Sequence, residues 1–409
     1  MGPYHTSTIA TTFELASSYI EAGMAQEVEK LGLEEMLEHQ KERLSETHPS
    51  TVLSMIKLAG LYVTLTRPLE ALAIFEKCYA IRKASLGENH ELSIGTRVNI
   101  ASCLGNAHRY EEACAVHAEM IERISTHLGA DHPMILATLI NSSADYRAIG
   151  QKDTALENIQ RAVDISTKLL GPKHPMTLTA INALGATYQV CGDFGKAEAV
   201  MEAAIALCDT GEEESAPTYL SLLSNLGNCK RMLTKYQESL PLGQKAIELR
   251  VKYLGMDHLE TLRGQMTHAA LLAETHDAAG AFPLINHVVT TVKSKYPGEK
   301  HFLYESYTIM ANTVMKFEGR LSEGFQYMVL AVEGFEELLG KEHETTKQVC
   351  GHLSSLYGQV GDPAQAKYWA ERGGQEYVRK RNTMGLVGPV VGVNETRYNN
   401  ILCSTLLLR

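Results

Sequence analysis

The sequence predicts an all-α protein, a right-handed superhelical solenoid of about nine helix-turn-helix repeats. Three observations support this fold class. A short motif containing Leu-Gly and His recurs at fixed spacing, apolar residues follow a helical period within each interval, and no interval alternates as a β-strand would. The solenoid is predicted to cover residues 1–381, and residues 382–409 to form a non-repeat C-terminal tail.

The recurring histidines set the period of the array. Steps of 42 or 43 residues connect successive histidines, except that one step falls on Ala216. The motif reads LGENH at 86–90, LGADHP at 128–133, LGPKHP at 170–175, LGMDH at 254–258 and LGKEH at 339–343. Repeats therefore start near residues 5, 48, 90, 132, 174, 216, 258, 301 and 343, those near 5, 216 and 301 being degenerate.

Each repeat is predicted to contain two helices, and the repeat that starts at His174 shows why. Pro175 suits the first turn of a helix, where its missing N–H costs little, and Gly192 suits the end of that helix. Between them, apolar residues recur every three or four positions, and a second helix with the same period begins near Asp193. Such a hairpin leaves an apolar stripe that only a neighbouring repeat can bury, so the repeats must stack.

Four repeats also share residue types at fixed offsets. These are Gly185-Tyr188-Gly192-Ala197, Ser143-Tyr146-Gly150-Ala155, Ala59-Tyr62-Thr66-Ala71 and Ser354-Tyr357-Gly361-Ala366. The pattern resembles the tetratricopeptide repeat, and the LGxxHP motif with its 42-residue period is similar to the kinesin-light-chain-like subclass of that family. The resemblance implies that asparagines in the concave groove hold a peptide backbone. The repeats near 216, 258 and 301 have Lys230, Leu272 and Met315 in place of the tyrosine, which predicts altered packing there.

Composition argues against several functions. The chain has 38 Lys and Arg against 48 Asp and Glu, a net charge of −10, so we expect neither a nucleic-acid nor a membrane partner. Eight cysteines without a CxxC pair predict reduced thiols and a cytoplasmic location. The histidines are one repeat apart, and packed helices lie about 8–10 Å apart, too far for one metal ion to join them. We expect no metal and no cofactor, and we interpret His48, His132 and His174 as residues that close the turn at a helix start.

Polar residues follow the stripe of each first helix that is not needed for packing, and this stripe should face the concave groove. Asparagine can both donate to and accept from a peptide backbone, and arginine can form paired hydrogen bonds with a carboxylate. The sequence therefore predicts that the groove binds a protein or peptide ligand, extended or acidic. The alternative is that these side chains are solvated and need no ligand. The candidate binding residues are Asn99, Asn141, Arg147, Asn182, Gln189, Asn225, Asn228, Arg231 and Lys316.

A second hypothesis is an enzyme or binding protein for a small metabolite that uses the same groove. Its acid–base candidates are Glu274, Lys316 and His352, one from each of three successive repeats. General acid–base catalysis requires contacts of about 3 Å to one substrate, so the superhelix would have to wind tightly around it. The apolar tail from residue 382 is expected to pack into the groove or over the last helices, or else to be an exposed docking segment.

Overall fold

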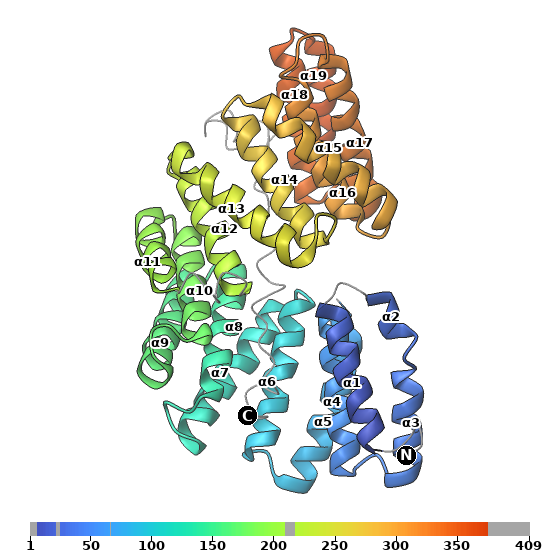
Figure 1. Cartoon of the computed structure of the whole chain (residues 1–409), viewed down its shortest axis with the longest axis vertical. Helices are drawn as coiled ribbons and strands as arrows, with labels where there is room; N and C mark the ends of the chain where they lie inside the picture. Colours follow the sequence, from blue (N-terminus) through green and yellow to red (C-terminus); the bar gives the residue numbers. More distant parts are fainter. Residues whose placement is uncertain (1–5, 22–24, 66, 209–216, 375–409) are drawn as a thin grey trace. The chain divides into compact units, whose positions relative to one another are not determined.

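The structure, a computed structural model, describes residues 6–21, 25–65, 67–208 and 217–374. Throughout these residues the regular structure is helical and no strand occurs, which confirms the predicted all-α repeat fold (Figure 1). The chain divides into two compact units, an N-terminal unit that ends at Cys229 and a C-terminal unit that begins at Lys230. The predicted tail 382–409 and the repeat starts near 5 and 216 lie outside the described residues.

The helices follow one another with short connections. The N-terminal unit contains α1 (Thr6–Glu21), α2 (Ala25–Glu29), α3 (Leu33–Leu44), α4 (Pro49–Thr64), α5 (Pro68–Leu86), α6 (Glu91–Asn106), α7 (Tyr110–His127), α8 (Met134–Ala148), α9 (Lys152–Leu170), α10 (Pro175–Cys191) and α11 (Phe194–Leu207). The division falls within α12 (Pro217–Met232). The C-terminal unit continues with α13 (Tyr236–Leu254), α14 (Leu259–Glu274), α15 (Ala278–Lys295), α16 (Lys300–Val314), α17 (Leu321–Leu339), α18 (Glu344–Gln359) and α19 (Pro363–Arg372).

From α4 onward the helices form pairs. We call the even-numbered member of each pair, α4 to α18, the A helix, and the odd-numbered member that follows it the B helix. Within each unit the A helix packs against its own B helix, from α4 with α5 to α10 with α11 and from α14 with α15 to α18 with α19, and some neighbouring A helices also touch, as α6 does α8 and α14 does α16 (Figure 1). Before α4 the chain forms three helices in place of the predicted pair, because the five-residue α2 lies between α1 and α3.

The glycine of the Leu-Gly motif ends the B helix. Gly171 follows α9 with φ 89° and ψ 163°, and Gly255 follows α13 with φ 89° and ψ 162°. A residue with a side chain rarely adopts this backbone conformation, whereas glycine does so readily. The motif therefore stops one helix three residues before the histidine that starts the next.

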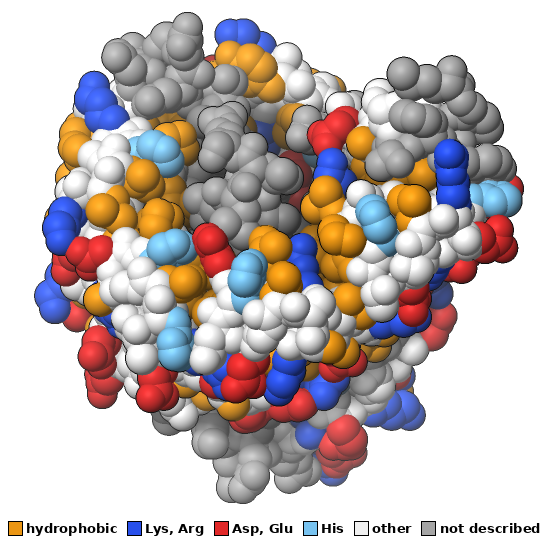
Figure 2. Space-filling model, turned by 90° about the horizontal axis from the view of Figure 1, so that it is seen from below, with side chains coloured by type: hydrophobic (Ala, Val, Ile, Leu, Met, Phe, Trp, Pro, Cys, Tyr) orange, Lys and Arg blue, Asp and Glu red, His pale blue; other side chains and the backbone are white. Residues whose placement is uncertain are grey.

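The histidine of the motif caps the A helix through its ring. His174 has extended backbone dihedrals, and its Nδ1 accepts a hydrogen bond of 3.1 Å from the backbone N–H of Met176. This bond satisfies one of the N–H groups that have no partner inside the helix. Five other histidines make the same bond to the residue two positions on: His48, His90, His132, His258 and His343, at 3.1–3.3 Å. The predicted turn-closing role is thus confirmed, and histidine side chains recur over the face seen in Figure 2.

His301 departs from this arrangement. It lies inside α16, which begins one residue earlier at Lys300, and the N-cap residue Glu299 makes no side-chain cap bond. The repeat that looked degenerate in sequence therefore begins its A helix without a histidine cap.

Each unit has its own apolar core between A and B helices. Phe13, Phe75 and Ile124 are almost fully buried in the N-terminal unit, and Phe302 and Phe335 in the C-terminal unit. A buried aromatic side chain contributes about 3–5 kcal/mol relative to alanine, so these contacts dominate the stability of the array.

Candidate functional site

The asparagines predicted to line the groove lie near the middle of successive A helices. Asn99, Asn141, Asn182 and Asn225 come from α6, α8, α10 and α12, and each is at most 9% exposed. They are therefore not solvated surface residues. A buried amide must be hydrogen-bonded to offset the loss of water, so its partners decide what it can still bind.

Asn141, Asn182 and Asn225 hydrogen-bond to side chains on neighbouring A helices. Nδ2 of Asn141 donates to Oγ of Ser102 on α6 at 3.0 Å. Nδ2 of Asn225 donates to Oδ1 of Asn182 at 2.9 Å, and so joins α12 to α10. The buried amides thus connect one repeat to the next, and whether they also contact a ligand stays a prediction.

Two further contacts join α10 to α12. Nε2 of Gln189 donates to the backbone oxygen of Asn225 at 2.9 Å, and the hydroxyls of Thr179 and Thr218 lie 3.1 Å apart. Gln189 is half-buried, as is Asn228 one turn beyond Asn225. Both amides therefore remain partly accessible on a face whose buried part is already hydrogen-bonded.

The predicted arginines are also half-buried. Arg147 lies in the last turn of α8, where its charge acts on the carboxylate of Asp145. Arg231 lies in the last turn of α12, and its Nη1 is 2.9 Å from Oε1 of Glu274 at the end of α14. Arg231 therefore already has a carboxylate partner, which an acidic ligand would have to replace or accept as a neighbour.

The three acid–base candidates have different surroundings. Glu274 pairs with Arg231, whereas Nε2 of His352 lies 3.0 Å from Oδ1 of Asn312 on α16. Lys316 is exposed just beyond the end of α16. The structure thus brings Glu274 and His352 each to another residue and shows no contact that joins the three described side chains to one another.

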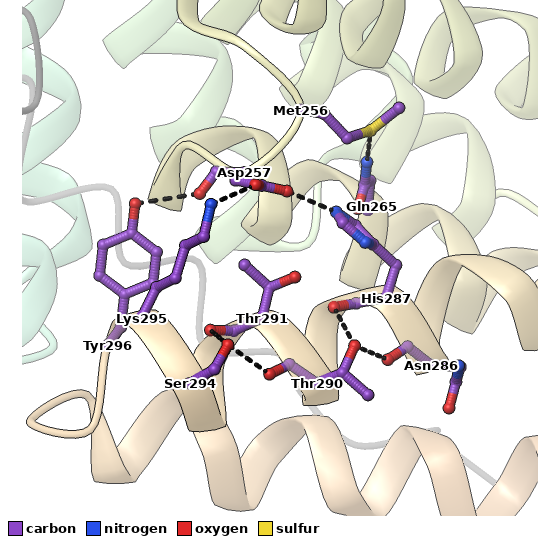
Figure 3. Close-up of polar contacts among 10 residues, drawn as sticks. All are labelled: Met256, Asp257, Gln265, Asn286, His287, Thr290, Thr291, Ser294, Lys295 and Tyr296. Atoms are coloured by element: carbon purple, nitrogen blue, oxygen red, sulfur yellow. Dashed lines mark hydrogen bonds and ion pairs between the residues drawn. The ribbon is translucent and has the colours of Figure 1, made fainter.

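A cluster that the sequence analysis missed surrounds Asp257, the residue before the cap of α14 (Figure 3). Its carboxylate oxygens lie 2.5 Å from Nζ of Lys295 and 3.1 Å from Nε2 of His287, and its backbone oxygen accepts from the Tyr296 hydroxyl at 3.0 Å. The hydrogen bond from Lys295 holds the pKa of Asp257 below its usual range. The cluster ties the α13–α14 turn to α15.

The signal for this cluster was in the repeat pattern. Asp131 precedes His132 as Asp257 precedes His258, and Nζ of Lys168 on α9 lies 2.5 Å from Oδ2 of Asp131. An acidic residue before the cap histidine, with a lysine near the end of the following B helix, predicts such a contact. Because these groups are well exposed, each contact contributes little to stability.

Among the helices described, none combines the length and the apolar character required to cross a membrane.

The paired helices, their fixed period and the polar A-helix face define the class of the protein, an all-helical repeat array. Two family models, both described as tetratricopeptide repeat, match the chain, one at residues 92–165 and 153–210 and the other at 51–91 and 220–260. Residues 51–210 and 220–260 of the chain are therefore tetratricopeptide repeats. No curated protein matches the sequence.

The solved structures that are similar to this chain share little sequence with it. The apo form of the quorum sensor NprR from B. thuringiensis is 14% identical with a TM-score of 0.60, and the match covers 90% of this chain and 98% of that one. The Rap conjugation gene regulator of plasmid pLS20, solved with the Phr* peptide, is 12% identical with a TM-score of 0.51 and coverages of 82% and 98%. A putative kinesin light chain from Podosopora anserina is 24% identical with a TM-score of 0.44, covering 50% of this chain and 97% of that one.

Proposed function

We propose that the protein is an interaction module whose A helices bind an extended, acidic segment of a protein or peptide partner. The observation that carries this proposal is the pattern of half-buried polar groups beside a buried amide network. Arg147 on α8, Gln189 on α10 and Asn228 on α12 are partly accessible, while neighbouring amides fix the helices that carry them. A ligand that lay across these helices would meet both amide groups and positive charge.

The structural relatives are consistent with this proposal. The Rap regulator was solved with a peptide bound, and its structure matches most of this chain. At 12% identity that likeness supports the fold alone, so the choice of ligand for this protein depends on its own residues. Each arginine favours an acidic segment in its own unit, Arg147 in the N-terminal unit and Arg231 in the C-terminal unit, and Glu274 beside Arg231 moderates the positive charge there.

The test is a binding measurement with two defined probes. One is a pool of fluorescein-labelled twelve-residue peptides rich in Asp and Glu, and the other is the same pool with Asn and Gln in their place. We expect the wild-type protein to bind the acidic pool more tightly. The double variant R147A/R231A should bind it at least about tenfold more weakly, with a smaller dependence on salt.

A matched control removes two charges elsewhere. Lys152 and Lys252 are exposed on B helices, so K152A/K252A lowers the net charge equally without touching the A helices. This variant should bind the acidic pool as the wild type does. The proposal fails if the wild type binds both pools equally or neither, or if R147A/R231A binds like the control.

The surroundings of the three acid–base candidates do not favour a metabolite site. Glu274 and His352 each have a different side chain as partner, and Lys316 is exposed. No observation on these residues favours a shared substrate.

A further inference from the structure

One ionisable pair lies in the core of the N-terminal unit, between a B helix and the next A helix. Nε2 of His117 on α7 lies 3.3 Å from Oδ2 of Asp145 on α8. His117 is 0% exposed and Asp145 is 7% exposed. Both ring nitrogens of His117, Nδ1 and Nε2, are buried, and neither makes a hydrogen bond of good geometry in the described part of the chain, so Nε2 meets the Asp145 carboxylate as a pair by distance. Asp145 is therefore the group with which this ring can exchange a proton.

The pair replaces uncharged core residues that the other repeats keep. The position of His117 is taken by Phe75 one repeat earlier and by Ile159 and Met201 in the next two, all fully buried. The position of Asp145 is likewise taken by Cys103, Thr187 and Cys229, which are also fully buried. Packing at these positions needs no charge, so the pair requires a separate physical explanation.

A third helix makes room for the carboxylate. A Cβ on Gly105 of α6 would lie 2.5 Å from Oδ1 of Asp145, closer than two such atoms can approach. The glycine thus lets three helices, α6, α7 and α8, converge on one carboxylate. A larger residue at position 105 would push Asp145 away from its place beside His117.

The groups that face the carboxylate set its charge preference. Burial raises the pKa of Asp145, and the contact with His117 and the charge of Arg147 only partly oppose this. Tyr110 and Cys114 on α7 and Tyr146 on α8 also interact with the carboxylate. In each of these three the pKa is raised, mainly by burial, so they are neutral at neutral pH. Gly105 on α6 brings no charge.

We propose that His117 and Asp145 share one proton in the folded protein and form a proton-operated interlock between α7 and α8. With one proton the pair is neutral, whether the proton lies on the carboxyl or on Nε2. Loss of that proton leaves a single carboxylate charge in the core, and a second proton leaves a buried cation beside Arg147. Both changes favour separation of the two helices, because an uncompensated buried charge is costly.

The direction of the pH effect follows from counting protons. An unfolded histidine titrates near pH 6.5 and an unfolded aspartate near pH 3.9, so above about pH 6.5 the unfolded pair holds no shared proton. The folded pair then holds one more proton than the unfolded pair, and stability must fall as pH rises. Between about pH 4 and 6.5 both states hold one proton, so the interlock is tightest there. The inference does not depend on the proposed ligand.

The first test compares the wild type with H117I/D145T, which installs residues found one repeat later. The unfolding equilibrium constant is measured in urea from pH 6.5 to 8. In the wild type it should rise with pH more steeply than in the double variant, by up to tenfold per pH unit, the effect of one proton. Each single variant should be less stable than the double variant at pH 7, by about a hundredfold in that constant for H117I.

M201I is the matched control, because Met201 lies two repeats beyond His117 at the same position and carries no charge. Its pH profile should equal that of the wild type. The proposal is overturned if H117I/D145T keeps the wild-type slope, or if H117I is as stable as the double variant.

A second measurement uses the wild type alone and so does not depend on the variants folding. In protein labelled with 15N-histidine, the ring signals of His117 should keep one position from pH 5 to 7, an interval in which a free histidine loses its proton. A ring that titrates over that interval in the folded protein would rule out a shared proton.

Discussion

The two units join successive A helices by different chemistry. From α6 to α12 the connections in the middle of the A helices are neutral, as in Asn141 with Ser102 and Asn225 with Asn182, although Glu91 at the start of α6 also lies 3.7 Å from Nε2 of His132. From α12 onward they include charged and titratable groups, namely Arg231 with Glu274, Arg263 with Glu299 and His352 with Asn312. Hydrogen-bonded amides thus predominate between the A helices of one unit and charged pairs between those of the other, so we expect the contacts of the second unit to be more sensitive to salt.

The C-terminal unit also departs from the repeat pattern in its backbone. Pro241 in α13 and Pro283 in α15 lie 42 residues apart at the same position of successive B helices. Each removes one backbone N–H from a helix interior. At the corresponding position in the N-terminal unit α5, α7 and α11 have alanine and α9 has glutamate. The comparison predicts that the two units unfold as separable parts.

The largest expected effect tests that separation. Phe335 and Phe75 are each almost fully buried, one in each unit, so F335A and F75A should each cost about 3–5 kcal/mol of unfolding free energy. The chain has one tryptophan, Trp369, which lies in the C-terminal unit and reports on it alone. F335A should lower the temperature of the tryptophan fluorescence transition, whereas F75A should leave that temperature unchanged and lower the temperature of the part of the circular dichroism change that does not coincide with it. Equal shifts of both signals by both variants would show a single cooperative unit.

The neutral contact in the N-terminal unit can be removed by N225A. This leaves Oδ1 of the buried Asn182 without its donor, at a cost of about 1–3 kcal/mol. Because neither partner is charged, the loss should be the same in 0.1 M and 1 M NaCl. The double variant N182A/N225A serves as the control and should cost less than the two single losses added together. A strictly additive result would mean that the two amides do not depend on each other.

One cap histidine, His258, predicts a pH effect that the His117–Asp145 pair does not. Burial lowers the pKa of His258, so its neutral form stabilises the fold above about pH 6.5, and this stability is lost as pH falls through its folded value. Asparagine caps a helix without titrating, so the unfolding free energy of H258N should equal that of the wild type at pH 7.5. Between pH 7 and 5 the variant should lose up to about 1 kcal/mol less of this free energy than the wild type. Urea unfolding at the two pH values measures the difference. Equal losses in both proteins would exclude His258 as the titrating group.

The smallest effect concerns the ion pair Arg231–Glu274. Both side chains are partly exposed, so R231A should cost only about 0.2–1 kcal/mol at low salt. The cost should shrink in 1 M NaCl, where the Debye length is about 3 Å. E274Q removes the same pair from the other side and should behave alike. A loss in R231A that salt leaves unchanged would assign its role to packing of the side chain and not to charge.

Much of the fold can be predicted from the residues that end and start the helices. The glycines and histidines of the motif end and start helices where the sequence placed them, as Gly171 and His174 show. The side-chain contacts between neighbouring A helices could not be predicted in this way. Periodicity gives the position of Asn141 on its helix, but it does not give the distance to Ser102 on the helix before, 39 residues earlier. The sequence therefore places Asn141, Asn182 and Asn225 on an accessible groove, whereas in the structure their side chains are buried and hydrogen-bonded.

Two contacts could have been found by comparing repeats. Arg231 and Glu274 have opposite charges and are 43 residues apart, one repeat length. His117 stands where other repeats have Phe75 or Ile159, and such a replacement of a core residue by an ionisable one suggests a buried partner. The distance of 3.3 Å to Asp145 still required the three-dimensional structure, because the two residues belong to different repeats.

In the LGxxH motif the glycine ends one helix and the histidine caps the next, and this affects how such arrays can diversify. Helix ends are specified by a few residues between the helices, so side chains along an A helix can change without moving its start or its end. Two adjacent copies could acquire an ionisable pair between them, as with His117 and Asp145, or one copy could acquire a different recognition surface, while the copies on either side keep their own boundaries.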